Sequence, residues 1–215
     1  MIICRKLKFG LINMRIAIDI NDVIRDFSRQ FRIQYQKHID PDFEIDDDGI
    51  TSFDLFEVFP FESKEAYNKF RYIDYPLEIY GRAEPVDKML PYRLNDWLQN
   101  TLRDVDEEKV PDVMLVSPFE ANLTIQATFA FLSVLPSRVR EVYFPIDSST
   151  IWDRCDILIT ANPNLIASVP DGKTVIKINK PYNADVDAEY SFDSMLDVIN
   201  DENDTVIELI ENGDA

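Results

Sequence analysis

The residue in this sequence best suited to chemistry is Asp19, which follows the apolar residues 16–18 and precedes a polar turn that contains Asn21 and Asp22. A carboxylate half buried at the tip of a strand is costly to keep, because it needs a cation or several N–H donors. As a functional group, Asp19 is a candidate nucleophile or metal ligand. The alternative is that it caps the next helix. The surrounding sequence favours a functional origin.

The elements that must position Asp19 alternate regularly along the chain. Nearly continuous apolar runs cover residues 15–19, 113–117, 141–145, 156–160 and 174–178. Segments with helical spacing cover residues 23–39, 86–102, 123–135 and 192–200. Strands that are apolar throughout are buried on both faces, as in a parallel sheet. The alternation predicts a doubly wound parallel α/β sheet of about five strands, with right-handed crossovers.

Ligands of such sheets bind at the carboxyl ends of the strands. The residues that end the predicted strands are therefore the candidate site residues. They are Asp19, Ser117, residues 145–147 and residues 160–162.

Residues 40–81 interrupt the alternation and are rich in aromatic and acidic side chains. We expect them to form an inserted helical cap, either as a lid over the strand ends or as a decoration packed on the core. The aromatic residues are candidates for a protein interface, or for the small core of the insertion itself. They are Phe53, Phe56, Phe59, Phe61, Tyr72 and Tyr75.

The predicted organisation is one α/β domain with an insertion. Residues 14–39 and 82–200 form the α/β core, and residues 40–81 form the cap. Residues 1–13 are an N-terminal extension or arm, and residues 201–215 are an acidic C-terminal segment.

Charge is distributed unevenly over the 215 residues, whose formal net charge is −18. Residues 1–39 carry eight basic and three acidic side chains, whereas residues 185–215 carry eleven acidic side chains and no Lys or Arg. The overall acidity argues against a protein that coats nucleic acid or an anionic membrane, because both need a positive field. An acidic end of this kind is typical of a solvated helix face or a frayed tail.

Cysteine and histidine are too few for several kinds of site. Two cysteines, Cys4 and Cys155, cannot form a disulfide framework or a thiolate zinc site, and His38 is the single histidine. No apolar run has the roughly 20 residues of a membrane helix. We therefore expect a cytoplasmic protein, or a virion protein if its source is viral, whose chemistry rests on carboxylates.

The residues around Asp19 resemble the first motif of the haloacid dehalogenase-like hydrolases, and of their 5'(3')-deoxyribonucleotidase branch in particular. In that motif a nucleophilic aspartate is followed two residues later by an acid/base aspartate. Ser117 stands where the family has a phosphate-binding Thr or Ser, and residues 40–81 stand where the family has a small cap. Residues 180–183 resemble a Pro-Trp-Asn element after the last strand. The resemblance covers about residues 14–200 and implies a haloacid dehalogenase-like Rossmannoid fold.

The sequence departs from the family at three chemical positions. Asn21 replaces the second aspartate and cannot transfer a proton, a loss of about 10² to 10⁴ in rate. No lysine lies between Lys109 and Lys173, where the family has its third motif, and Arg154 is the nearest cation. No Asp or Glu lies between Asp156 and Asp171, where the family holds Mg²⁺. Three losses together indicate a degenerate site.

The first functional expectation is therefore a catalytically degenerate member of this fold, kept as a structural or interaction component of a larger assembly such as a viral particle. Its partners would be other proteins, with no membrane, no sequence-specific nucleic acid and no cofactor. The second is a Mg²⁺-dependent 5'-nucleotidase or phosphatase with Asp19 as nucleophile. The third is a module that binds a nucleotide or phosphate without turning it over.

Overall fold

The computed structural model of the protein describes residues 14–100, 102, 110–135 and 139–212. Its parallel strands form one sheet in the order β3-β2-β1-β4-β5-β6. The strands are β1 (Arg15–Asp19), β2 (Asp112–Val116), β3 (Glu141–Tyr143), β4 (Ile157–Thr160), β5 (Thr174–Ile178) and β6 (Tyr190–Phe192). The predicted doubly wound parallel α/β sheet is confirmed. The sixth strand was not predicted, because Tyr190–Phe192 lie between acidic residues and form no continuous apolar run.

Both faces of the sheet are covered, which explains why its strands are apolar throughout. In β1, Ile16 and Ile18 belong to one hydrophobic cluster and Ala17 to another, as the alternation of a strand requires. The first cluster includes residues of α4 (Leu90–Gln99), α5 (Leu123–Ser133), α7 (Met195–Ile199) and α8 (Thr205–Asn212). The second includes residues of α6 (Pro163–Ile166) and of the short helix η4 (Ser148–Ile151).

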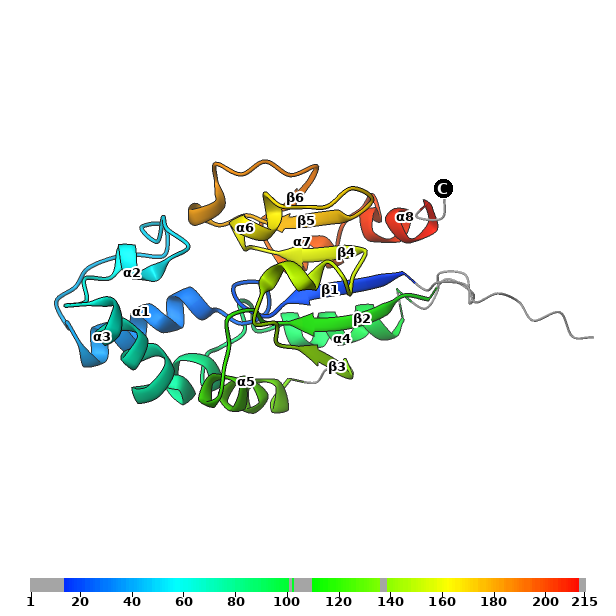
Figure 1. Ribbon diagram of the computed structural model, residues 1–215. Coiled ribbons are helices and arrows are strands. Elements are labelled where there is room, and N and C mark those ends of the chain that lie inside the picture. The colour runs from blue at the N-terminus through cyan, green and yellow to red at the C-terminus, as the bar shows by residue number, and fades with distance from the viewer. Residues whose placement is uncertain (1–13, 101, 103–109, 136–138, 213–215) are drawn as a thin grey trace, which may run out of the picture.

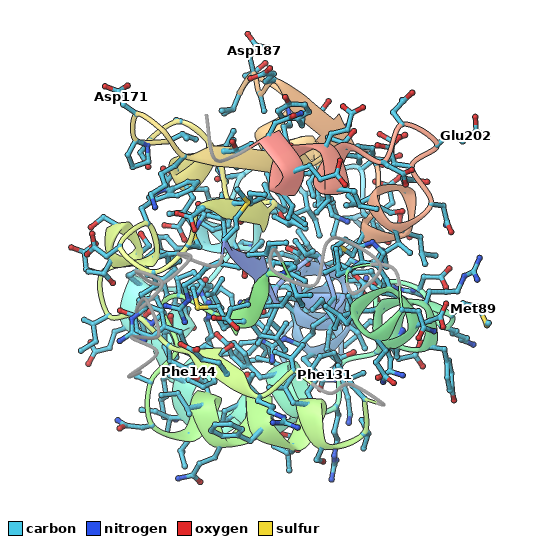
Figure 2. The ribbon with its side chains drawn as sticks, turned by 90° about the vertical axis from the view of Figure 1, so that its right-hand side faces the viewer. Met89, Phe131, Phe144, Asp171, Asp187 and Glu202 are labelled. Carbon is cyan, nitrogen blue, oxygen red and sulfur yellow. The ribbon has the colours of Figure 1, made fainter. Side chains whose placement is uncertain are left out.

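The acidic C-terminal segment contributes to the core as well as to the surface. In α8, Val206 and Ile210 are buried in the first cluster, while the acidic residues of the helix are not buried. Figure 2 shows the carboxylates of Asp171, Asp187 and Glu202 at the outer rim of the molecule. The negative charge is thus carried largely on the outside of the fold. The predicted N-terminal arm, residues 1–13, lies outside the described residues.

The inserted residues form a helical cap that packs on α1 (Phe27–His38). Figure 1 shows the cap helices at one end of the sheet and α8 at the opposite end. Phe31 of α1 is completely buried among the rings of Phe59, Phe61, Tyr67 and Phe70. The cap elements are α2 (Leu55–Val58), α3 (Lys64–Lys69) and the π-helical turns η1 (Phe70–Asp74) and η2 (Leu77–Gly81).

The six aromatic residues considered as interface candidates face inward to different degrees. Phe59 is completely buried, and Phe56, Phe61 and Tyr75 are half-buried against the same cap cluster. Phe53 contacts the ring of Tyr182 at 5.6 Å between centroids. The side chain of Tyr72 is half-buried beside a cap arginine, Arg71. Phe56, Phe59, Phe61 and Tyr75 thus form part of a small core, the second interpretation of the sequence, whereas Phe53 and Tyr72 lie outside that cluster.

No helix in the described part of the chain is both long and apolar enough to cross a membrane.

Candidate functional site

The candidate site lies at the carboxyl end of β1. In the sheet, β2 and β3 lie on one side of this strand, and β4, β5 and β6 lie on the other. There β1 pairs with β2 on one side and with β4 on the other. Open α/β sheets bind ligands at this position, at the carboxyl ends of the strands. The topology therefore brings Asp19, Ser117 and Asn162 to one edge, as the strand-end argument predicts.

Asp19 is buried at the tip of β1, with an exposure of only 3 %. The Thr160 hydroxyl donates to Asp19 Oδ2 at 2.8 Å, and the Asn21 backbone N–H donates to Oδ1 at 3.3 Å. Burial raises the pKa of Asp19 to about 7; the two donors act against this rise and the charge of Asp22 adds to it. Near neutral pH a large share of the Asp19 side chains is therefore protonated.

Asn21, which the family resemblance places at the acid/base position, is held by Arg25. The guanidinium donates to Asn21 Oδ1 through Nε at 3.0 Å and through Nη2 at 2.5 Å. Asn21 Nδ2 in turn donates to Ser117 Oγ at 3.2 Å. The amide is thus fixed in orientation on both sides and has no proton to transfer at any ordinary pH.

A completely buried ion pair anchors this arrangement. Arg25 Nη2 lies 2.6 Å from Glu120 Oε1, and both side chains are 0 % exposed. The same Glu120 oxygen accepts from the Ser117 hydroxyl at 2.6 Å, and the other accepts from the Thr128 hydroxyl at 2.5 Å. The family resemblance assigns Ser117 to phosphate binding. In the structure, however, its hydroxyl donates to Glu120.

Asp22 adopts a left-handed backbone conformation, with φ at 58°, and its carboxylate is held by three donors. It accepts from the backbone N–H of Ser28 at 2.8 Å and from the Ser28 hydroxyl at 2.5 Å. The Tyr182 hydroxyl donates to it at 2.9 Å. Tyr182 itself is fixed because the next residue, Asn183, donates to the carbonyls of Ala161 and Ile178 at 2.8 and 2.9 Å.

Asp19, Asn21, Asp22 and Tyr182 line a cavity of about 60 Å³ between the strand ends and the cap, whereas Ser117 lies outside its lining. That volume admits a few waters or one small anionic group. Apolar side chains from α1, the cap and the loop after β2 form much of its wall, including Phe27, Phe53, Leu55 and Phe119. Its polar lining consists of Asp19, Asn21, Asp22, Ser28, Arg71, Asn162 and Tyr182.

Asn162 follows β4, where the family resemblance would place a metal-binding carboxylate. Its Oδ1 accepts from the Asn164 backbone N–H at 3.0 Å and so caps α6. Its Nδ2 is buried and has no hydrogen-bond partner among the described residues. Because the cap interaction fixes the amide orientation, the side chain offers a spare N–H donor rather than a spare oxygen.

The donors at this site do not fit Mg²⁺, the metal that the fold family implies. Magnesium prefers several carboxylate oxygens in octahedral geometry. Asp22 is engaged by three donors, and the spare group of Asn162 is an N–H. Within the described residues, no group of three or more His, Cys, Asp or Glu side chains could hold a metal ion.

The family resemblance also implies a cation at the site from the third motif, and the sequence offers Arg154 for this role. Arg154, the nearest basic residue in the sequence, stacks on Tyr143 at 4.2 Å and lies 3.5 Å from Glu141. It does not line the cavity. Of the described residues, the one cation that does is Arg71 from the cap.

Sequence reasoning missed Arg25, Glu120 and Arg71. Arg25 and Glu120 are 95 residues apart, and neither lies in a pattern that predicts their pairing. Arg71 lies within a π-helical turn, which sequence periodicity does not reveal. A chemical signal could have pointed to them. A buried carboxylate predicted at a strand end needs a cation or donors nearby, and these can come from any part of the chain.

No protein-family model matches the sequence, and no curated protein matches it either. Among solved structures, the chain is similar to a protein from Burkholderia xenovorans that is described as a haloacid dehalogenase-like hydrolase. The identity is 11 %, the TM-score is 0.53, and the match covers 90 % of this chain and 98 % of that one. A second match is the HAD-hydrolase YfnB from Bacillus subtilis, solved with magnesium, with 11 % identity and a TM-score of 0.48 over 87 % of this chain and 97 % of that one.

The first likeness confirms the predicted haloacid dehalogenase-like fold. At 11 % identity it says nothing about activity, and the resemblance to the deoxyribonucleotidase branch stays a prediction. Neither likeness supports the expected role as a component of a larger assembly, so that role also stays a prediction.

Proposed function

We propose that this protein binds a small phosphate-bearing ligand in the cavity between the strand ends and the cap, and does not hydrolyse it. The observation that carries the proposal is the fixed pair of Asn21 and Ser117. Arg25 and Glu120 hold both side chains in a closed hydrogen-bond network, so neither is free for proton transfer.

The binding half of the proposal rests on what the cavity retains. Its lining combines a cation, Arg71, with Asn162, whose buried N–H donor has no partner among the described residues. A buried donor without a partner costs about 1–3 kcal/mol, and a ligand acceptor would recover that free energy. Apolar side chains around these groups exclude water, as in most small-ligand sites.

A second candidate function, hydrolysis of a phosphomonoester with Asp19 as nucleophile, is favoured by one observation. Asp19 lines the cavity at the position where such a nucleophile would stand. Nucleophilic attack needs the ionised carboxylate, whereas burial favours the protonated form up to about pH 7. The absence of fitting metal donors among the described residues counts against this function as well.

The two functions are separated by an assay of the full chain with nucleoside monophosphates and an aryl phosphate in excess Mg²⁺. The proposal predicts a rise in melting temperature with ligand and no release of inorganic phosphate above the buffer rate. Phosphate release that disappears in Asp19→Asn would establish the hydrolase instead. No thermal shift with any phosphate compound would refute the binding function.

A further inference from the structure

We infer that the phosphate group of the ligand binds Arg71 on the cap side of the cavity, with the uncharged polar part of the ligand toward the strand ends. This inference rests on the proposed function and specifies the orientation of its ligand. It reverses the orientation that a hydrolase would need, in which the phosphate lies against Asp19.

The hydrogen bonds of Arg71 leave part of its guanidinium available. Nε donates to the Tyr80 hydroxyl, and Nη1 donates to the Tyr67 hydroxyl at 3.0 Å. Nη2 makes no hydrogen bond to the described residues, and no carboxylate among them forms an ion pair with Arg71. A guanidinium in this state can donate two further hydrogen bonds to phosphate oxygens, and Arg remains charged at all ordinary pH values.

Aromatic rings fix the position of that guanidinium. Its Cζ lies 4.9 Å from the ring centre of Tyr72, 5.1 Å from that of Phe27 and 5.7 Å from that of Tyr80. The π-helical turn η1 that carries Arg71 is a type of distortion often found at functional sites. Arg71 is thus held in place before any ligand arrives, which lowers the entropy lost on binding.

The strand-end side of the cavity has the opposite character. Both of the cavity's acidic side chains, Asp19 and Asp22, lie there, and the nearby Arg25 is already paired with Glu120. A phosphate at that side would meet the negative charge of Asp22, and that of Asp19 when it is ionised, without a compensating cation. Neutral hydroxyl or amide groups would be accommodated better, because they can bond to the carboxylate oxygens and to the spare Asn162 N–H.

The chemical class that fits both ends is a small phosphate monoester whose other end carries hydroxyl or amide groups. The apolar wall formed by Phe27, Phe53 and Leu55 would enclose its middle. The cavity volume of about 60 Å³ limits the enclosed part of the ligand to a few heavy atoms.

The test compares two variants that remove one candidate phosphate contact each, Arg71→Gln and Ser117→Ala. The probes are inorganic phosphate and glycerol phosphate, with glycerol as the uncharged control, measured by calorimetric titration of the folded full chain. We expect Arg71→Gln to weaken binding of both phosphate probes about 10- to 100-fold and Arg71→Lys to recover part of the loss. Ser117→Ala should change the affinity for the phosphate probes by less than about threefold, since the Ser117 hydroxyl already donates to Glu120.

Arg82→Gln is the matched control, because it removes a charge directly after the cap that is exposed and does not line the cavity. It should bind like the wild type, and melting curves must show that each variant is folded. Loss in Ser117→Ala with little change in Arg71→Gln, or equal loss in both, would overturn the inference but leave the binding function standing. Failure of the wild type to bind either phosphate probe would overturn both.

Discussion

Arg25 and Glu120 form an ion pair from which water is fully excluded, and through it the loop after β1 is joined to the loop after β2. Buried pairs of this kind contribute little net stability compared with well-packed apolar residues, but breaking one leaves an unpaired charge inside the protein. Here the pair also determines the orientation of Asn21 and Ser117. The residues that would carry out chemistry in a hydrolase are therefore part of the structural framework.

Glu120→Gln should lower the free energy of unfolding by about 3–5 kcal/mol, because Arg25 would remain buried without its counter-charge. Chemical denaturation monitored by circular dichroism measures this. Glu141→Gln is the control: Glu141 pairs with Arg15 at 2.8 Å but is 43 % exposed, so its loss should cost less than about 1 kcal/mol. Removing both partners with Arg25→Met and Glu120→Leu should cost less than the sum of the two single changes. Equal costs for Glu120→Gln and Glu141→Gln would contradict the account.

The pKa of Asp19 makes stability depend on pH. Because burial raises it from 3.8 to about 7, the folded state holds a proton that the unfolded state releases within this range. The contribution of this bound proton to the stability of the folded state is fully present below about pH 3.8 and is lost as pH rises through 7. Relative to Asp19→Asn, which cannot ionise, the wild type should therefore lose stability between pH 4 and 7. Melting curves of both proteins at several pH values test this, and parallel pH profiles would show that Asp19 titrates normally.

Magnesium should not stabilise the wild type at millimolar concentration, because the cavity lacks suitable oxygen donors. Asn162→Asp combined with Asn21→Asp should restore a thermal shift with Mg²⁺, since aspartate can still cap α6 and adds carboxylates beside Asp19. Asn164→Asp adds a carboxylate at an exposed position and should have no such effect. A clear rise in the melting temperature of the wild type with Mg²⁺ would contradict this prediction and show that the cavity binds the ion.

Phe31 of α1 should be the most sensitive apolar position of the cluster between α1 and the cap. It is completely buried and contacts several aromatic rings, so Phe31→Ala should cost about 3–5 kcal/mol. Phe129→Ala, at a site 52 % exposed, provides the comparison and should cost far less. Denaturant titration of both variants gives the two values. Similar costs would indicate that the cap aromatic cluster is not a packed core.

The fold could be predicted from the sequence because its signals are local. The apolar runs that became β1, β2, β4 and β5 are long enough to show continuous burial, and each ends close to a polar residue of the site. β6 escaped prediction because Tyr190–Phe192 lie between acidic residues and form no continuous apolar run. The helix predicted from Val23 begins instead at Phe27, because the left-handed turn at Asp22 delays it.

The site was predicted only on its strand-end side. Asp19, Asn21 and Ser117 follow from the positions where strands end, and the structure brings them together. The contributions of Arg25, Glu120 and Arg71 depend on contacts between distant segments, for which the sequence gives no periodic signal. Their side chains decide whether the site is free to react, so the chemistry could not be judged from the motif alone.

The most direct test of the central claim is a ³¹P NMR experiment on the full chain with excess glycerol phosphate and Mg²⁺, followed over a day. Binding without hydrolysis predicts that the ester resonance broadens or shifts with protein concentration while no inorganic phosphate signal grows above that of the protein-free sample. Growth of the inorganic phosphate signal in proportion to protein, and its absence with Asp19→Asn, would contradict the account.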